Sequence, residues 1–581
     1  MRAMFKTAFA CLFALVLVSC GGSSSPPPPT VTVTPSSATV ALNATQQFSA
    51  SSSTGTSAMA TWSVNGVQGG NSTVGTIDST GKYTAPGSFP SPNAVTITAS
   101  IGGGSGTASA TVAYLMNNRA AESVPVKMGS SGGNAKDFVD SGGTRTCCSG
   151  TLGALVSRGG STFILSNNHV LDKSGTGTPG DNIQQPGLVD NQCDLAGAPP
   201  TTVGNLTEAA ALKPSPCSGV CTGPAPSNVD AAIAAINVAN VDGSGSILEL
   251  GAAGPSSIAA APPSSTLAVP AVGQNVAKSG RSTGLTCSVV GSVNTSISVQ
   301  YDAACGGALA FTSTFANQVV INGGSFSQSG DSGSLVVTTD TARPVGLVFA
   351  GNSTSTSANP IQDVLNAFAG GGTTTIVGGG DHAVSCQPTA SSTLASTSVG
   401  ASSTKLSVQE TDRVSAVKDK YANELLQDSA IADVAVGASA DSSGEGALVI
   451  TLQEATTVPA VLDGVRTRVT YAFSPAPRAS VDAISGAKLL NQALAQSLMQ
   501  QSGIQGVGIG ISDDNPAEPA MVIYTISGIP HPDISPVMAG LRTRIIEGDR
   551  FRAFGWGRDA VNQTSCRQKQ PAKIATQVRT K

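Results

Sequence analysis

Gly330-Asp331-Ser332-Gly333-Ser334 stands between a loop rich in Ser and Gly and the apolar run Leu335-Val-Val337. A serine between glycines lets the backbone turn tightly and point amide N–H groups at a single oxygen atom. Acyl transfer needs such groups most, because negative charge develops on the carbonyl oxygen under attack. The segment therefore indicates a strand preceded by a nucleophile turn.

The chain has three histidines, so a His-dependent mechanism has three candidates. His382 lies in a Gly-rich linker, and His531 lies between prolines in a loop. His169 ends the run Phe163-Ile-Leu-Ser-Asn-Asn-His169, which reads as an apolar strand entering a turn. A rigid strand can hold such a side chain while it faces a cleft. The alternative for His169 alone is a buried histidine satisfied by the backbone.

An acidic residue accompanies this histidine and serine. Asp230 stands at the head of the apolar segment Asn228-Val-Asp-Ala-Ala-Ile-Ala234. A carboxylate beside a core strand needs a polar partner, and a histidine N–H is a suitable one.

The order His169, Asp230, Ser332, with spacings of 61 and 102 residues, resembles the trypsin/chymotrypsin-type serine proteases, whose nucleophile motif is Gly-Asp-Ser-Gly. The stretch from Val276 to Cys287, with its Lys-Ser-Gly-Arg-Ser-Thr-Gly core, is similar to secreted bacterial members. Leu-Ser-Asn-Asn-His-Val-Leu resembles the branch that includes the plant narrow-leaf protease. The likeness covers about 250 of the 581 residues.

The resemblance implies a chymotrypsin-like double β-barrel over residues 120–370, with no cofactor and no metal. In it Ser332 is the nucleophile, His169 the general base and Asp230 the group that orients the histidine. The N–H groups of Gly330 and Ser332 form the oxyanion hole.

The sequence also departs from the family pattern. Ser334 replaces the usual second glycine, no cysteine adjoins His169, and no Ile-Val-Gly-Gly start is present. Activation by a new N-terminus is therefore in doubt. In the secreted bacterial branch a buried arginine takes the place of that terminus, which implies that Arg281 pairs with Asp331.

The specificity pocket can be anticipated from the same resemblance. In the trypsin-like pattern an aspartate six residues before the nucleophile makes the pocket acidic. Here that position holds Phe326. We expect an apolar or partly filled pocket for small or hydrophobic side chains, and no preference for Lys or Arg.

The N-terminus predicts export. Arg2 and Lys6 flank an apolar run that ends at Leu17-Val-Ser-Cys20 and is too short to span a bilayer. The segment resembles a bacterial lipoprotein signal, with residues 1–19 removed and Cys20 lipidated. The alternative is an ordinary cleaved signal with a chance cysteine. The Ser/Pro-rich residues 20–29 then form a tether from the membrane, and the protein is placed at the outer membrane or cell surface.

Residues 30–114 alternate polar and apolar positions in short runs between Gly, Ser, Asn and Pro. Such runs predict a β-sandwich. The segment from Val74 to Pro86, together with Trp62, resembles bacterial immunoglobulin-like domains of surface proteins. A spacer or adhesion module is the expected role.

A repeat follows the Gly/Ser/Thr-rich linker at 371–408. Asp463-Gly-Val-Arg-Thr-Arg-Val469 recurs as Ala539-Gly-Leu-Arg-Thr-Arg-Ile545, 76 residues later. Each copy follows a helix and two strands, which predicts a duplicated α/β domain over 409–558 and a tail over 559–581. The arginines could bind anions or solvate a sheet edge, and the second role is favoured.

The eleven cysteines are consistent with export. Removal of Cys11 with the signal and lipidation of Cys20 leave nine, and most are expected in disulfides. We predict a Cys287–Cys305 bridge across a hairpin and a Cys386–Cys566 bridge around the repeated domain. Zinc at Cys217 and Cys221 is disfavoured, because no histidine is near.

Composition limits the remaining possibilities. A chain of 581 residues predicts several domains, and with a net charge of −4 it offers no basic field for nucleic acid. The fold class is thus mainly β and multidomain. The function expected is a cell-envelope-anchored serine endopeptidase that acts on proteins or peptides. The alternative is a surface adhesion or binding lipoprotein with an inactive protease-like domain. An esterase is disfavoured, because the Gly-x-Ser-x-Gly elbow and the Ser-first order are absent.

Overall fold

The computed structural model describes residues 29–41, 44–53, 59–86, 90, 94–113, 118–141, 144–195, 200–214, 229–251, 259–302, 305, 309–386, 406–553 and 566–569. The chain divides into two compact units, residues 1–112 and 113–581. Strands dominate both units, so the mainly β class predicted from the sequence is confirmed.

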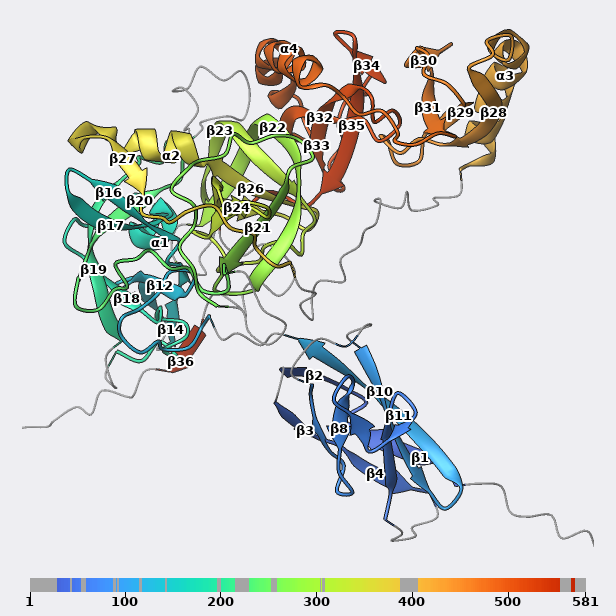
Figure 1. The fold of residues 1–581 in the computed structure, drawn as a ribbon. Helices are drawn as coiled ribbons and strands as arrows, with labels where there is room; N and C mark the ends of the chain where they lie inside the picture. The colour runs from blue at the N-terminus through green and yellow to red at the C-terminus, as the bar shows by residue number, and fades with distance from the viewer. Residues whose placement is uncertain are drawn as a thin grey trace, which may run out of the picture. The chain divides into compact units, whose positions relative to one another are not determined.

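The first unit consists of short strands (Figure 1). A five-stranded sheet has the order β2-β11-β10-β5-β6, a four-stranded sheet the order β3-β9-β8-β7, and β1 pairs with β4. Burial alternates along β10, as one buried sheet face requires. The core combines side chains from both larger sheets, including Val64 and Ile97 from one and Ile77 and Tyr83 from the other. The strands are β1 Val31–Thr34, β2 Ser37–Ala41, β3 Thr45–Gln47, β4 Ser49–Ser52, β5 Thr61–Val64, β6 Val67–Gln68, β7 Gly70–Asn71, β8 Gly75–Ile77, β9 Lys82–Thr84, β10 Ala94–Ile101 and β11 Gly104–Ala113.

The second unit begins with an eight-stranded sheet of order β15-β12-β18-β19-β20-β17-β16-β27. Its strand β17 runs straight into the short helix α1, which contains His169. The elements are β12 Ser131–Asn134, β15 Gly150–Thr151, β16 Ala154–Arg158, β17 Ser161–Ser166, α1 Asn168–Leu171, β18 Asn182–Gln185, β19 Thr201–Ala209, β20 Ala232–Ile236 and β27 Thr374–Ile376. Beside it, β13 Phe138–Ser141, β14 Thr144–Cys147 and β36 Cys566–Lys569 form a small sheet. A short 3-10 turn covers Lys173–Gly175.

Six further strands close into an antiparallel barrel. They pair in the order β21-β24-β25-β26-β23-β22, and β22 pairs back onto β21. The turn with Ser332 precedes β24. The strands are β21 Asn275–Gly280, β22 Gly284–Asp302, β23 Leu309–Asn322, β24 Leu335–Thr338, β25 Pro344–Gly351 and β26 Ser355–Pro360. Helix α2 Ile361–Ala367 and a 3-10 turn Ala369–Gly371 follow.

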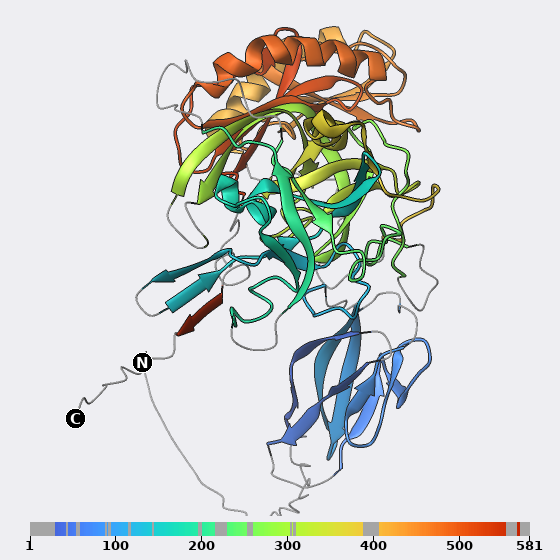
Figure 2. The same ribbon diagram turned by 90° about the vertical axis from the view of Figure 1, so that its left-hand side faces the viewer.

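Residues 408–548 show one order of elements twice. The first copy has α3 Val408–Leu425, β28 Ile431–Ala438, β29 Gly446–Leu452, β30 Val461–Leu462 and β31 Val465–Tyr471. The second has α4 Val481–Met499, β32 Ile504–Ile511, β33 Pro519–Ile526, β34 Val537–Met538 and β35 Leu541–Gly548. Both helices begin at a serine N-cap whose side chain accepts a backbone N–H, which satisfies a donor of the first turn. Figure 2 shows α4 lying along the sheet that its own strands form.

The second copy is continuous with the barrel. Strand β32 pairs antiparallel with β22, with Ser292 opposite Gly510 and Ile297 opposite Gly506. The barrel strands and those of the second copy therefore form one ten-stranded sheet. Helix α4 adds a contact to this junction, because the side chain of Asn491 in its middle donates to the carbonyl oxygen of Asn294.

The first arginine of each repeated motif is buried rather than at a solvated sheet edge. Arg466 donates to the carbonyl oxygen of Thr543 over 2.7 Å, and Arg542 donates to that of Thr467 over 2.6 Å. Each is about 2% exposed and is also paired with a glutamate. The sheet-edge interpretation was wrong for these two residues, because each copy uses its arginine to bond the other.

The disulfides differ from both predicted bridges. The structure pairs Cys147 with Cys193, Cys148 with Cys305, and Cys287 with Cys386. The expected hairpin between Cys287 and Cys305 is not formed, because Cys287 lies near the start of β22, a single strand of 19 residues, and Cys305 lies beyond its end. A strand runs in one direction and so keeps its two ends apart. The Cys386–Cys566 bridge is wrong as well, since Cys386 is bonded to Cys287.

Candidate active site

His169 and Asp230 meet in the interior of the second unit. Nδ1 of His169 lies 2.6 Å from Oδ2 of Asp230, and the backbone N–H of His169 donates to Oδ1 over 3.2 Å. Both side chains are fully buried. The carboxylate therefore holds both the ring and the main chain of the histidine, and so sets the direction of the imidazole.

Asp230 is itself held from several elements. Its backbone N–H donates to Oδ1 of Asn359 over 2.8 Å, and its carbonyl oxygen accepts from Nδ2 of Asn167 over 2.7 Å. The hydroxyl group of Tyr301 donates to Oδ2 over 2.8 Å. Burial, and next the charge of Asp230, hold the pKa of Tyr301 well above its usual range, so the hydroxyl keeps its proton. Sequence reasoning missed Tyr301 and Asn359, which no local motif marks.

The turn around Ser332 depends on its two glycines. Gly330 and Gly333 both have φ near +95°, a region that other residues rarely adopt. A Cβ atom on Gly330 would collide with the Arg281 side chain, and one on Gly333 with the hydroxyl of Ser166. The Gly-Asp-Ser-Gly motif is thus required by the backbone and by close packing.

This turn is bonded to the sheet that carries the histidine. The N–H of Thr151 donates to the carbonyl oxygen of Ser332, and its Oγ1 donates to that of Gly330, both over 2.9 Å. Ser166, three residues before His169, donates to the carbonyl oxygen of Thr151 over 2.7 Å. Through Thr151 and Ser166, hydrogen bonds therefore link the turn of Ser332 to the strand end that precedes His169, while the contact between Ser332 and His169 stays a prediction.

The oxyanion hole at Gly330 and Ser332 stays a prediction. Within the described ranges, neither the N–H of Gly330 nor that of Ser332 donates to a backbone carbonyl oxygen. The hydroxyl group of Ser332 donates to the carbonyl oxygen of Ala553 over 3.2 Å. Ser332 is 2% exposed.

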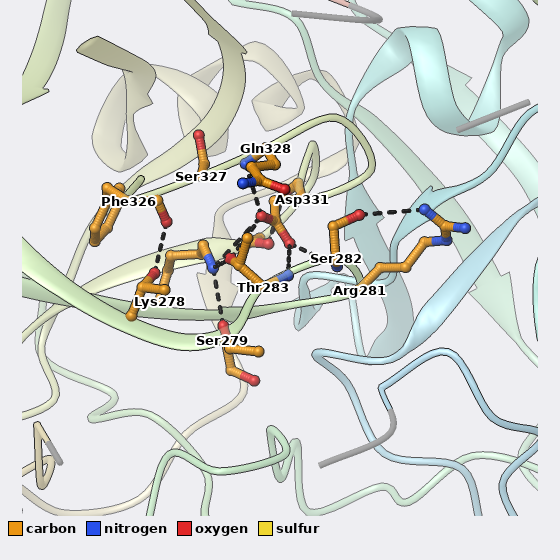
Figure 3. Close-up of polar contacts among 12 residues, drawn as sticks. Lys278, Ser279, Arg281, Ser282, Thr283, Phe326, Ser327, Gln328 and Asp331 are labelled. Atoms are coloured by element: carbon orange, nitrogen blue, oxygen red, sulfur yellow. Dashed lines mark hydrogen bonds and ion pairs between the residues drawn. The ribbon is translucent and has the colours of Figure 1, made fainter. Parts of the chain in front are cut away.

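Arg281 is not the partner of Asp331. Figure 3 shows its guanidinium directed away from that carboxylate, and its Nε and Nη2 bond Asp190 at 2.6 and 2.8 Å. The predicted Arg281–Asp331 pair is therefore wrong. The cation beside Asp331 is Lys278, whose Nζ lies 3.7 Å from Oδ2. Burial lowers the pKa of Lys278, and the charges of Asp331 and Glu249 oppose that shift.

Asp331 keeps the loop before the nucleophile in place. Its carboxylate accepts N–H groups of Ser282, Thr283 and Gln328 at 2.8 to 3.1 Å, and the hydroxyl of Thr283 at 2.7 Å (Figure 3). Ser334, the departure from the family pattern, donates its hydroxyl hydrogen to the carbonyl oxygen of Asp331 over 2.5 Å. This serine therefore adds a hydrogen bond within the turn.

Phe326 lies in the core of the barrel. Its side chain is 2% exposed and packs among apolar residues that include Val276 and Val348. Nζ of Lys278 lies 5.8 Å from the ring centroid. The role of Phe326 in specificity stays a prediction.

A small cavity adjoins the histidine. Its volume is about 90 Å³, and the lining includes His169, Lys136, Asp137 and Asp302. Burial raises the pKa of Asp137 to about 7, while Lys173 opposes the shift. The cavity belongs to the same site.

Other sequence predictions fall beyond the described ranges. Cys20 and the pair Cys217 and Cys221 are among them. In the described parts of the chain, no helix is long and apolar enough to cross a membrane, and no group of His, Cys, Asp or Glu could hold a metal ion.

Comparison with known proteins gives solved structures only. No family model and no curated protein matches the chain. A glutamic-acid-specific serine protease is 17% identical with a TM-score of 0.27, covering 43% of this chain and 100% of its own. Thermobifida fusca protease A is 15% identical with a TM-score of 0.25, covering 42% and 98%. Cellulomonas bogoriensis chymotrypsin is 14% identical with a TM-score of 0.24, covering 39% and 91%. The chain is thus similar to chymotrypsin-like serine proteases over two-fifths of its length, and at these TM-scores the function has to be argued from the site itself.

Proposed function

We propose that the chain is a serine-type endopeptidase with His169, Asp230 and Ser332 as its triad. One observation carries the proposal: the 2.6 Å contact between Oδ2 of Asp230 and Nδ1 of His169. In the same site, Thr151 links the Gly-flanked turn of Ser332 to Ser166, at the strand end before that histidine. A carboxylate on Nδ1 sets the tautomer in which Nε2 can accept a proton.

The chemistry follows from these positions. The hydroxyl oxygen of Ser332 attacks the carbonyl carbon of a peptide bond, and His169 takes the hydroxyl proton. Asp230 stabilises the imidazolium ion that forms. The N–H groups of Gly330 and Ser332 stabilise the oxyanion, and His169 then gives its proton to the leaving amine. Water attacks the resulting ester of Ser332 with the same histidine as base, which releases the acid and restores the enzyme.

The same proposal includes the location. Cys20 carries the lipid anchor, and the first unit, an immunoglobulin-like spacer, lies between Cys20 and the peptidase in the sequence. Substrates are then proteins or peptides at the cell envelope. The support is the lipoprotein-like signal and the short alternating strands of the first unit.

The test is covalent labelling with a fluorophosphonate, which reacts only with an activated serine. Label on Ser332, located by peptide mass spectrometry and absent from Ser332→Ala, supports the peptidase. An enzyme that neither labels nor cleaves a peptide library, after its cleft has been opened as described below, favours the binding or adhesion lipoprotein.

A further inference from the structure

A segment of the chain itself lies against the nucleophile. The hydroxyl group of Ser332 donates to the carbonyl oxygen of Ala553, a residue that follows the last strand of the repeated region. His169 and Asp230 are fully buried and Ser332 is 2% exposed. A peptidase has to admit a peptide to these groups, so the buried state calls for an explanation.

Residues 551–553 are bonded as an added β-strand. Arg552 exchanges both backbone hydrogen bonds with Gly351, at the end of β25, each over 3.1 Å. On the other side, the N–H of Gln300 donates to the carbonyl oxygen of Phe551 over 2.9 Å, and the N–H of Ala553 donates to that of Gln300 over 3.0 Å. Extended peptides bind proteins by this main-chain pairing, which gives affinity independent of side chains.

The side chains alternate as they do in a bound strand. Phe551 and Ala553 are fully buried, and Arg552 is exposed. Phe551 lies in the aromatic cluster that contains Tyr301 and Phe349, with its ring centroid 5.8 Å from that of Tyr524. Burial raises the pKa of Asp302, and the charge of Arg552 opposes that rise.

The second repeated copy delivers this strand. Strand β35 ends at Gly548, and the carbonyl oxygen of Asp549 then accepts from Asn352 over 3.0 Å and from Gln505 over 2.9 Å. Gln505 also accepts the N–H of Phe551. Because β32 is paired with the barrel, the segment stands beside the site at a high effective concentration.

We propose that residues 549–553 are a built-in ligand of the catalytic cleft, which keeps the peptidase inactive until they are displaced. The inference rests on the proposed function and extends it to regulation and substrate class. A competing substrate binds as an extended strand, with an aromatic side chain in the place of Phe551 and a small one in the place of Ala553.

The test uses two substitutions at one residue of the full chain. Arg552→Pro removes the N–H that Gly351 accepts, whereas Arg552→Ala keeps it. We expect Arg552→Pro to raise fluorophosphonate labelling and peptide hydrolysis about tenfold over Arg552→Ala, through the loss of strand pairing. The peptide Asp-Arg-Phe-Arg-Ala should inhibit the Arg552→Pro enzyme. Labelling and hydrolysis that are measurable and equally fast in both variants and in the unchanged protein would overturn the proposal.

A second measurement does not depend on activity. In a Ser332→Ala background, hydrogen exchange should show the amides of Gln300 and Gly351 protected with Arg552→Ala and exchanging faster with Arg552→Pro. If these amides exchange faster with Arg552→Pro but no variant that retains Ser332 is labelled, residues 549–553 are still a bound strand and the proposed peptidase function is rejected. If the amides of Gln300 and Gly351 exchange equally fast in both variants, residues 549–553 are not a built-in ligand, whatever activity is measured. If Arg552→Pro fails to fold, Phe551→Ala, which removes the buried anchor, takes its place in both measurements.

Discussion

The hydroxyl group of Tyr301 donates a hydrogen bond of 2.8 Å to Oδ2 of Asp230. The same oxygen lies 2.6 Å from Nδ1 of His169. A residue from the barrel strand β22 thus acts on the histidine through the carboxylate that orients it, and couples the two halves of the site.

Tyr301→Phe should lower kcat about tenfold while the KM for a peptide changes little, because one hydrogen bond to the orienting carboxylate is lost and substrate contacts are kept. Tyr524→Phe is the matched control, since its hydroxyl bonds Ser292 away from Asp230. Steady-state kinetics in the Arg552→Pro background measures both. An unchanged kcat in Tyr301→Phe would show that Tyr301 has only a packing role.

Ser332→Ala and His169→Ala should each lower peptide hydrolysis by roughly 10³- to 10⁶-fold, and the double variant should lose little more, because triad members act as a unit. Asp230→Asn should lower peptide hydrolysis by about 10⁴-fold, since it favours the wrong tautomer of the histidine. His531→Ala, an exposed histidine, is the control. Equal hydrolysis by Ser332→Ala and the unchanged enzyme would refute the triad.

The pH dependence of stability should be set partly by Asp441, which accepts from Ser512 and the N–H of Asp513 at the contact between the two repeated copies. Burial, and next the charge of Asp514, raise the pKa of Asp441 to about 7 from 3.8. The folded chain therefore retains a proton that the unfolded chain releases, so the free energy of unfolding falls as pH rises from about 4 to 7.

Asp441→Asn should remove this slope, worth roughly 1 to 4 kcal/mol across that window. Urea unfolding at several pH values measures it, with the exposed Asp433→Asn as the control. A slope as steep in Asp441→Asn as in the unchanged chain would show that other groups cause it.

The Cys287–Cys386 disulfide closes a loop with a sequence separation of 99 residues and ties the chain after β27 to the barrel. Replacing both cysteines with serine should cost about 2 to 5 kcal/mol, because the unfolded chain regains the freedom of that loop. Thermal unfolding of the double variant measures the loss. Peptide mapping without reduction should recover Cys287 joined to Cys386; recovery with Cys305 instead would contradict the structure.

Cys20 should carry lipid, and the protein should fractionate with membranes. Cys20→Ser should move it to the soluble fraction, because the tether then has nothing to insert. Mass spectrometry of the mature N-terminus reads the modification directly, and an unmodified residue there would reject the anchor.

Much of the candidate site could be predicted from the sequence, because each part carries a local chemical signature. Ser332 stands between glycines whose positive φ the turn requires, and His169 follows an apolar strand. Asp230 heads a buried segment and needs a partner. The backbone conformation of a turn and the cost of burying a charged group depend on a few neighbouring residues. Both can therefore be recognised in the amino-acid sequence.

Only the tertiary structure decided which groups meet across long separations. Lys278, three positions before the expected Arg281, is the cation beside Asp331. Side chains alternate between the two faces of a strand, and Arg281 comes after the end of the strand that holds Lys278, so the two cations point in different directions. Tyr301 reaches Asp230, and Ala553 reaches Ser332 across 221 residues. The entropy cost of closing a loop rises only slowly with its length, so the distance between two residues in the sequence does not predict whether they meet. These contacts and the disulfides depend instead on how the two sheets and the repeated copies pack.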